Sequence, residues 1–193
     1  GTGNTPCFLA IGDLNRDGYD DIIVGAPLYS NGQVNEGRAF LYLGSPSGPS
    51  VSPAWIAEGD QVDARFGNRV AAAGDVNDDG YSDVIVGAPL IDNGQADEGR
   101  AVVYHGGVGG LALAPAWVAE SNQVGAQFGF SVFTAADVNG DGFSDILVGA
   151  PYQNVFFGPS NAGAAWCFHG SAAGVDATVD WIYQGSQVDE FLG

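Results

Sequence analysis

The stretch DLNRDGYDD, residues 13–21, sets the pattern of this chain, and it occurs three times. It returns as DVNDDGYSD at residues 75–83 and as DVNGDGFSD at residues 137–145, so the spacing is 62 residues each time. In every copy, positions 1, 3, 5 and 9 carry side-chain oxygens and position 6 is Gly. Oxygen donors at alternating positions, a main-chain carbonyl at position 7 and a glycine at a sharp turn are typical of a site for a hard cation.

The pattern predicts one Ca²⁺ ion in each of the three loops. Oxygen-only coordination excludes zinc and copper as natural occupants, and a flexible loop with many oxygens favours calcium over magnesium. Tyr19, Tyr81 and Phe143 would each contribute a main-chain carbonyl. The predicted ligands are Asp13, Asn15, Asp17, Tyr19 and Asp21; Asp75, Asn77, Asp79, Tyr81 and Asp83; and Asp137, Asn139, Asp141, Phe143 and Asp145.

Two other interpretations of these loops are less consistent with the sequence. An EF-hand needs a Glu at position 12 between two helices, but position 12 here is Val24, Val86 or Val148, inside a strand-like run. A plain turn explains one segment rich in Asp, Asn and Gly. It does not explain the same four oxygen positions in three copies.

The 62-residue period predicts an array of equal all-β units. Each repeat divides into four short runs of β-branched and aromatic residues bounded by Gly, Pro, Asn and Ser. The expected strands are 8–11, 21–24, 38–43 and 54–57; 69–73, 83–86, 100–105 and 116–119; and 131–135, 145–148, 164–169 and 180–183. Runs such as Ile22–Val24 are apolar on both faces, so such strands must be covered on both sides. Three four-stranded antiparallel blades of the β-propeller type meet this requirement.

The repeat boundaries predict three blades and a short remainder. The blades span residues 1–62, 63–124 and 125–187, and residues 188–193 would begin a following blade. Propellers usually have about 4–8 blades, and three would leave two sheet faces bare. The blades would therefore belong to a larger propeller, or copies of the chain would assemble head to tail into a ring or a filament. In either case, we expect Val188–Gly193 to dock on a following blade or on the first blade of another copy.

Composition limits the partners. The net charge is −18, and the chain has five basic residues in all. Nucleic acid is excluded as a partner because contact with phosphates needs Lys and Arg. No stretch resembles a membrane span, so no membrane insertion is expected. The two cysteines, Cys7 and Cys167, are either buried free thiols or a disulfide between neighbouring copies, and both interpretations stay open.

The motifs around the loops resemble a known family. Phe-Gly pairs at 66–67 and 128–129 precede two loops, and Gly-Ala-Pro follows all three loops at 25–27, 87–89 and 149–151. This combination resembles the FG-GAP repeat of integrin alpha chains and related extracellular proteins. The resemblance implies one four-stranded blade per repeat, calcium between its first two strands and a secreted or cell-surface location. The first repeat departs from the pattern, with Asn4 and Thr5 in the Phe-Gly positions, and Leu192-Gly193 occupies these positions after the third repeat.

Two functions follow from the resemblance, and neither is catalytic. The first is a calcium-stabilised adhesive or structural module that assembles with itself, with further blades or with a protein ligand. The second is a lectin-like propeller in which Trp55, Trp117, Trp166 and Trp181 stack on sugars, although three of these recur at one repeat position, as core residues do. Phe156 and Phe157 in the third repeat mark a contact surface or fold back on their own blade. No nucleophile elbow or phosphate loop is present, so we predict that the chain is not an enzyme.

Overall fold

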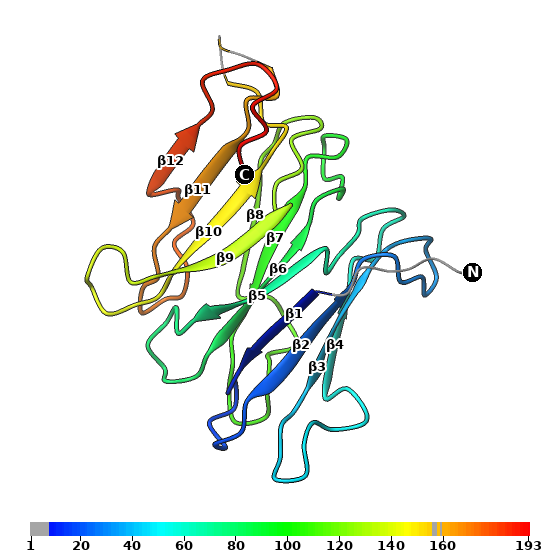
Figure 1. The fold of residues 1–193 in the computed structure, drawn as a ribbon, viewed down its shortest axis with the longest axis vertical. Coiled ribbons are helices and arrows are strands. Elements are labelled where there is room, and N and C mark those ends of the chain that lie inside the picture. The colour runs from blue at the N-terminus through cyan, green and yellow to red at the C-terminus, as the bar shows by residue number, and fades with distance from the viewer. Residues whose placement is uncertain (1–7, 156–157, 159) are drawn as a thin grey trace.

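The computed structural model describes residues 8–155, 158 and 160–193, and these residues form three four-stranded antiparallel sheets (Figure 1). Cys7, Phe156 and Phe157 lie outside the described residues. The first sheet contains β1 (Phe8–Gly12), β2 (Asp21–Ala26), β3 (Arg38–Tyr42) and β4 (Trp55–Glu58). The second contains β5 (Arg69–Gly74), β6 (Asp83–Ala88), β7 (Arg100–Tyr104) and β8 (Trp117–Glu120). The third contains β9 (Ser131–Ala136), β10 (Asp145–Ala150), β11 (Ala164–Phe168) and β12 (Trp181–Gln184).

All twelve predicted strands are present, and the order within each sheet follows the chain. The second strand of each sheet is longer than predicted. The predicted strands end at Val24, Val86 and Val148, just before Gly-Ala-Pro, but Gly25 and Ala26 still pair with Ala39 and Arg38 of β3. The prediction was wrong by two residues because glycine and alanine keep their ladder donors, and only the proline lacks one.

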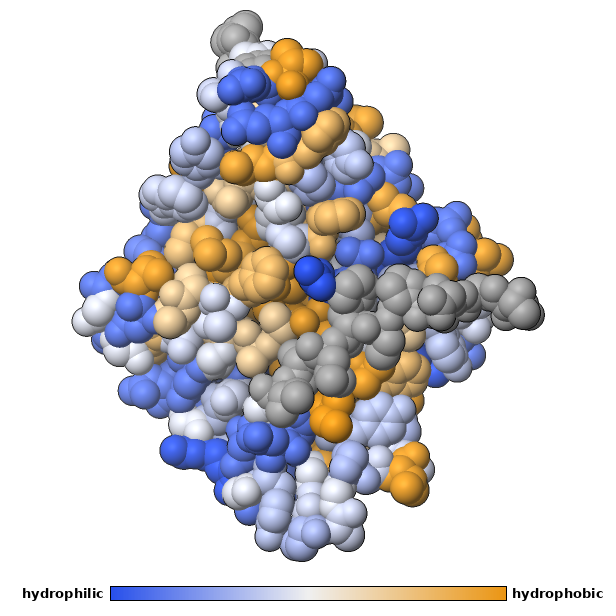
Figure 2. Space-filling view, in the orientation of Figure 1, coloured by the Kyte–Doolittle hydropathy of each residue, from blue (hydrophilic) through white to orange (hydrophobic). Residues whose placement is uncertain are grey.

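The first strands of the three sheets lie beside one another. β5 packs against β1 on one side and against β9 on the other, so the sheets share an inner edge and their later strands lie farther out. Figure 2 shows apolar residues gathered over the middle of one face and mostly polar residues around its rim. This arrangement is the one expected for consecutive blades of a propeller.

The cores lie between the sheets. Ile23, Leu41 and Trp55 of the first sheet pack with Val84 and Val86 of the second. Residues of the opposite parity face the third sheet. Ile85 and Val103 pack there with Ile146, Val148 and Phe168. Every residue of β6 is therefore buried, whereas burial alternates along β2, which has a blade on one side only. The apolar runs that predicted cover on both faces receive it in the central blade.

The joint between consecutive blades is made by the two glycine motifs. Gly67 of the Phe-Gly pair donates its N–H to the Gly87 carbonyl at 3.0 Å, and Gly129 donates to Gly149 at 3.1 Å. A Cβ atom on Gly25 would overlap the carbonyl oxygen of Gly67, and one on Gly87 would overlap that of Gly129. The glycines of Gly-Ala-Pro thus provide the space into which the next Phe-Gly backbone fits.

The Phe-Gly pair also returns to the blade before it. Phe66 forms a parallel bridge with Gly37, and Phe128 forms one with Gly99. Leu192 forms the equivalent bridge with Gly163, and Gly193 lies beside Gly149. Asp189, Phe191 and Leu192 also donate backbone N–H groups to Ser160, Asn161 and Ala162, so this segment packs on the third blade of its own chain. Phe66-Gly67 makes the same return contact and still leads into the second blade, so the expected docking of Val188–Gly193 on a following blade or another copy stays a prediction.

The joint predicts a large stability difference between two glycine substitutions in the second blade. Gly87→Ala should lower the free energy of unfolding by at least about 2–3 kcal/mol, because its methyl group would meet backbone that cannot rotate away. Gly109→Ala is the control, since a Cβ atom there meets nothing within 4 Å. Urea unfolding of the two variants measures the difference, and equal stabilities would contradict this account of the joint.

Candidate metal centre

The three acidic loops connect the first and second strands of the blades. Their backbones turn in the same way in each copy. The glycine at position 6 has φ 91°, 89° and 98° in Gly18, Gly80 and Gly142. Position 4 is also left-handed, with φ 58° at Arg16 and 55° at Asp78. The glycine at position 6 is thus required by the conformation, as the sequence predicts.

The aspartate at position 1 binds the far side of its own loop. The two oxygens of Asp13 accept the backbone N–H groups of Asp17 and Gly18, at 3.2 and 3.0 Å. The corresponding bonds of Asp75 are 3.1 and 2.7 Å, and those of Asp137 are 3.1 and 3.0 Å. This carboxylate therefore folds the loop back on itself.

Positions 3 and 5 are bound to each other. The Asn15 side-chain oxygen accepts the N–H of Asp17 at 3.0 Å, and its amide donates to an Asp17 oxygen at 3.0 Å. The other Asp17 oxygen accepts the N–H of Tyr19 at 2.9 Å. The second and third loops repeat the same three bonds. The four predicted side chains thus have one arrangement in all three loops.

The aspartate at position 9 has a structural role that the sequence analysis missed. Asp21 is buried; one oxygen accepts the N–H of Leu14 at 3.0 Å and the other accepts that of Gly44 at 2.8 Å. Asp83 makes the equivalent bonds to Val76 and Gly106, and Asp145 to Val138 and Gly170. This aspartate ties the loop to the segment that follows the third strand. The sequence feature that could have indicated this role is the glycine that follows each third strand, at Gly44, Gly106 and Gly170.

The donor chemistry of each loop fits a hard cation. All the grouped side chains offer oxygen, and a carboxylate oxygen that accepts one N–H keeps a second lone pair. The three aspartates of a loop are not drawn closely together in the described chain. Their oxygens do not lie within 4.8 Å of one another as a group. Like charges favour this separation, and a bound cation would have to draw them inward.

Burial raises the pKa of the aspartate at position 9. The pKa of Asp83 rises from 3.8 to about 6, mainly because the carboxylate is buried. Hydrogen bonds from Gly106 and Val76 and the nearby His105 lower it in part. Burial likewise raises the pKa of Asp21. In contrast, the N–H of Phe143 and the amide of Asn139 lower the pKa of Asp141, which favours its charged form.

With this geometry established, comparison with known proteins identifies the repeats. The FG-GAP repeat model matches residues 8–42, 66–104 and 128–167, which together make up more than half of the chain.

The chain belongs to the FG-GAP repeat family.

Similar proteins include integrin alpha-IIb of Mus musculus, at 37% identity over 150 residues, and integrin alpha pat-2 of Caenorhabditis briggsae, at 40% over 160 residues. Each match covers 74% of this chain, but only 14% and 13% of the integrin chains, respectively. The chain thus spans about one seventh of the length of these relatives.

The tryptophans of the FG-GAP repeats separate into buried and exposed positions. Trp55 and Trp117 are buried between blades and donate their indole N–H groups to Ala112 and Asp176 carbonyls of the next blade, both at 2.9 Å. The predicted core role is confirmed for these two. Trp166 is also buried. Trp181, at the same repeat position as Trp55, is 51% exposed, so the prediction was wrong for this residue in the structure. In the described part of the chain, Cys167 is a buried free thiol.

The buried Asp83 predicts a titration near pH 6 in chelator. Because its folded-state pKa lies above its unfolded value, its contribution to stability is full below about pH 4 and is lost as the pH rises through 6. The ¹³C shift of the Asp83 carboxyl group, assigned with Asp83→Asn, measures the midpoint. His105→Gln should raise this midpoint, since it removes a group that favours the carboxylate. A midpoint near 4 in the wild-type protein would contradict the proposed effect of burial.

Proposed function

We propose that this chain is a calcium-stabilised, non-catalytic module for adhesion and assembly, located outside the cell. The observation that carries the proposal is the hydrogen-bond pattern of the three acidic loops, which holds the same oxygen donors in the same order three times. Integrin alpha chains among the relatives support an adhesive, cell-surface role. No helix suited to crossing a membrane occurs in the described residues.

Calcium in these loops would act on stability. When bound, it supplies positive charge that offsets repulsion between the carboxylates. The ligands are those predicted for each loop, and the aspartate at position 9 connects them to the rest of the blade. Asp21, for example, lies at the start of β2 and binds both the loop at Leu14 and the segment after β3 at Gly44. A stiffened loop would therefore fix three strands of its blade. We expect affinities of about 10⁻⁴–10⁻³ M, as in other extracellular modules.

Assembly would use the outer face of the third blade. At the two internal joints, the indole of the last strand packs edge-on against an aromatic ring of the next blade. Trp55 meets Tyr104 at 4.8 Å between ring centroids, and Trp117 meets Phe168 at 4.9 Å. Trp181 is the third member of this series. Tyr42 occupies the receiving position on the first blade. The matching occupant is therefore a blade of the same type, from a second copy or from the remainder of a longer chain.

The lectin-like alternative receives less support. A sugar platform needs exposed aromatic faces, but Trp55, Trp117 and Trp166 are buried in the described structure. Trp181 and Tyr183 are exposed and stacked, with ring centroids 6.2 Å apart. Trp55 and Trp117, at the same repeat position, contact the next blade. Packing against a blade therefore explains an aromatic residue at position 181 more directly than sugar binding does.

Asp17→Ala tests the calcium role. Its melting temperature should lie slightly below that of the wild-type protein in chelator, since the bond to the N–H of Tyr19 is lost. The difference should widen by several degrees at 5 mM calcium, roughly 1 kcal/mol or more. Asp20→Ala removes an acid from the same loop at a position outside the predicted ligand set. It should respond to calcium as the wild-type protein does. A wild-type melting temperature unchanged by calcium would contradict the proposal.

Trp181→Ser tests assembly through the third blade. We expect light scattering of the wild-type chain at micromolar concentration to show masses above the monomer, and Trp181→Ser to shift them toward the monomer. Ile182→Ser is the matched control. Ile182 is 42% exposed, and its counterparts Ile56 and Val118 stay exposed even where a blade follows. A clean monomer mass for the wild-type chain would exclude head-to-tail assembly, leaving further blades of a longer chain as the occupant.

A further inference from the structure

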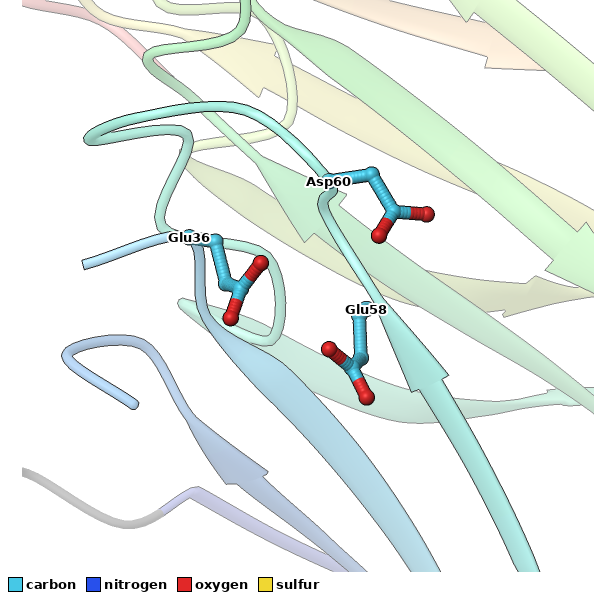
Figure 3. Close-up of side chains that lie close together, drawn as sticks. All are labelled: Glu36, Glu58 and Asp60. Carbon is cyan, nitrogen blue, oxygen red and sulfur yellow. The ribbon is translucent and has the colours of Figure 1, made fainter. Parts of the chain in front are cut away.

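A second group of acidic side chains lies at the opposite end of the first blade from its acidic loop. Glu36 precedes β3, Glu58 ends β4, and Asp60 lies in the connection to the second blade. One carboxylate oxygen from each side chain lies within 4.8 Å of the other two. Figure 3 shows the Glu36 carboxylate pointing toward the space between the other two. Because strands of an antiparallel sheet alternate in direction, this group is separated from residues 13–21 by the length of the sheet.

The carboxylate of Glu36 is buried and incompletely hydrogen-bonded, which is independent of its closeness to the other two acids. Its side chain is 0% exposed. One carboxylate oxygen accepts the N–H of Asn31, and the other has no hydrogen-bond partner among the described residues. Burying a carboxylate oxygen without a partner lowers the stability of the fold, because the oxygen loses its hydrogen bonds to water and forms none with the protein. The unpartnered oxygen belongs to the carboxylate that faces Glu58 and Asp60, so a cation there would supply the missing partner.

The local charge suits a divalent ion. Three carboxylates contribute three negative charges. Arg38 contributes one positive charge through its ion pair with Glu58. The guanidinium is held in place on its other side by the ring of Tyr29, with 4.1 Å to the ring centroid. The remaining charge of −2 would be neutralised by one divalent cation.

The second joint and the corresponding positions of the third blade provide natural comparisons. At the second joint, Glu98, Arg100 and Glu120 repeat this set of charges, and the buried Glu98 also has a carboxylate oxygen without a hydrogen-bond partner among the described residues. Asn122 stands in place of Asp60, and both backbones are left-handed, with φ 55° and 52°. The backbone is therefore alike at this position, but the charge of these side chains is only −1. In the third blade, the corresponding residues are Ala162, Ala164, Gln184 and Ser186, so none of these four positions carries a charge.

We propose that Glu36, Glu58 and Asp60 bind a divalent cation of the calcium type at the first joint, separately from the three loops. The ligands are all carboxylate oxygens, which suits a hard ion. Glu58 and Asp60 line a groove of about 450 Å³ together with Asn31 and Tyr104, so solvent and ions reach the site from outside. Glu36 is buried next to these two acids, with one carboxylate oxygen within 4.8 Å of an oxygen of each.

Such an ion would strengthen the connection between the first two blades. Glu36 and Glu58 belong to the first blade, whereas Asp60 lies on the segment that leads to the second. The carbonyl of Glu36 already accepts the N–H of Phe66 at 3.0 Å, next to the Phe66–Gly37 bridge. A cation held by all three carboxylates would fix this crossing segment from its outer side.

The comparison of joints supplies the experiment. Asp60→Asn gives the first joint the side chain of the second, and Asn122→Asp does the reverse. Equilibrium dialysis against terbium, a calcium-sized ion for oxygen sites, counts the ions bound per folded chain at saturation. Relative to the wild-type chain, Asp60→Asn should bind one ion fewer and Asn122→Asp one ion more. Melting temperatures in chelator establish that each variant is folded.

Equal terbium counts for all three proteins would overturn the proposal. If Asp60→Asn failed to fold, Asn122→Asp would still test the proposal. A terbium count for Asn122→Asp equal to that of the wild-type chain would show that a third carboxylate at this position does not create a site. The test is also separate from the calcium role of the loops. Asp17→Ala removes a loop ligand and should change the count independently, so either idea can fail while the other stands.

Discussion

The close contact between glycine backbones at each joint determines the rest of this structure. A Cβ atom on Gly87 would overlap the carbonyl of Gly129, and one on Gly129 would overlap that of Arg100. Gly25 and Gly67 repeat these contacts, with Arg38 in place of Arg100. This contact fixes the distance between second strands of neighbouring blades. The apolar side chains of β6 can then fill both gaps at once, which explains why that strand is buried throughout. The family's two motifs are therefore the two halves of one joint.

Each of the first two blades has buried carboxylates at both ends, and the two ends differ in how these carboxylates are hydrogen-bonded. At one end, Asp21 and its counterparts bind backbone N–H groups from two segments, so the carboxylate stays partnered although buried. At the other end, Glu36 keeps an oxygen without a partner. A buried carboxylate that is fully hydrogen-bonded organises the backbone, whereas one left short of a partner indicates a ligand or water. The same residue class thus serves two purposes within one repeat.

Most of the fold could be predicted from the sequence because it repeats. Three copies of residues 13–21 indicate the period, and the short β-branched and aromatic runs around them indicate the strands. The features that could not be predicted depend on contacts between repeats. The burial of Trp55 and the exposure of Trp181 cannot be separated by local pattern, since both stand at one repeat position and differ only in whether a blade follows. Likewise, Leu192 bridges back to Gly163, a pairing decided by backbone geometry after folding.

The candidate site shows the same division. The candidate ligands of the loops could be predicted from the sequence, because the oxygen-bearing residues and the glycine lie within nine consecutive residues. Glu36, Glu58 and Asp60 lie on three separated segments, and only the return of β4 alongside β3 brings them together. Their charge pattern becomes meaningful when the joints are compared. The first joint has a third carboxylate and the second has an amide at the same backbone position, whereas the matching positions of the third blade are uncharged. The first two share a left-handed backbone at Asp60 and Asn122, so exchanging these two side chains changes the charge at that position. Charge is the property that selects a cation over water.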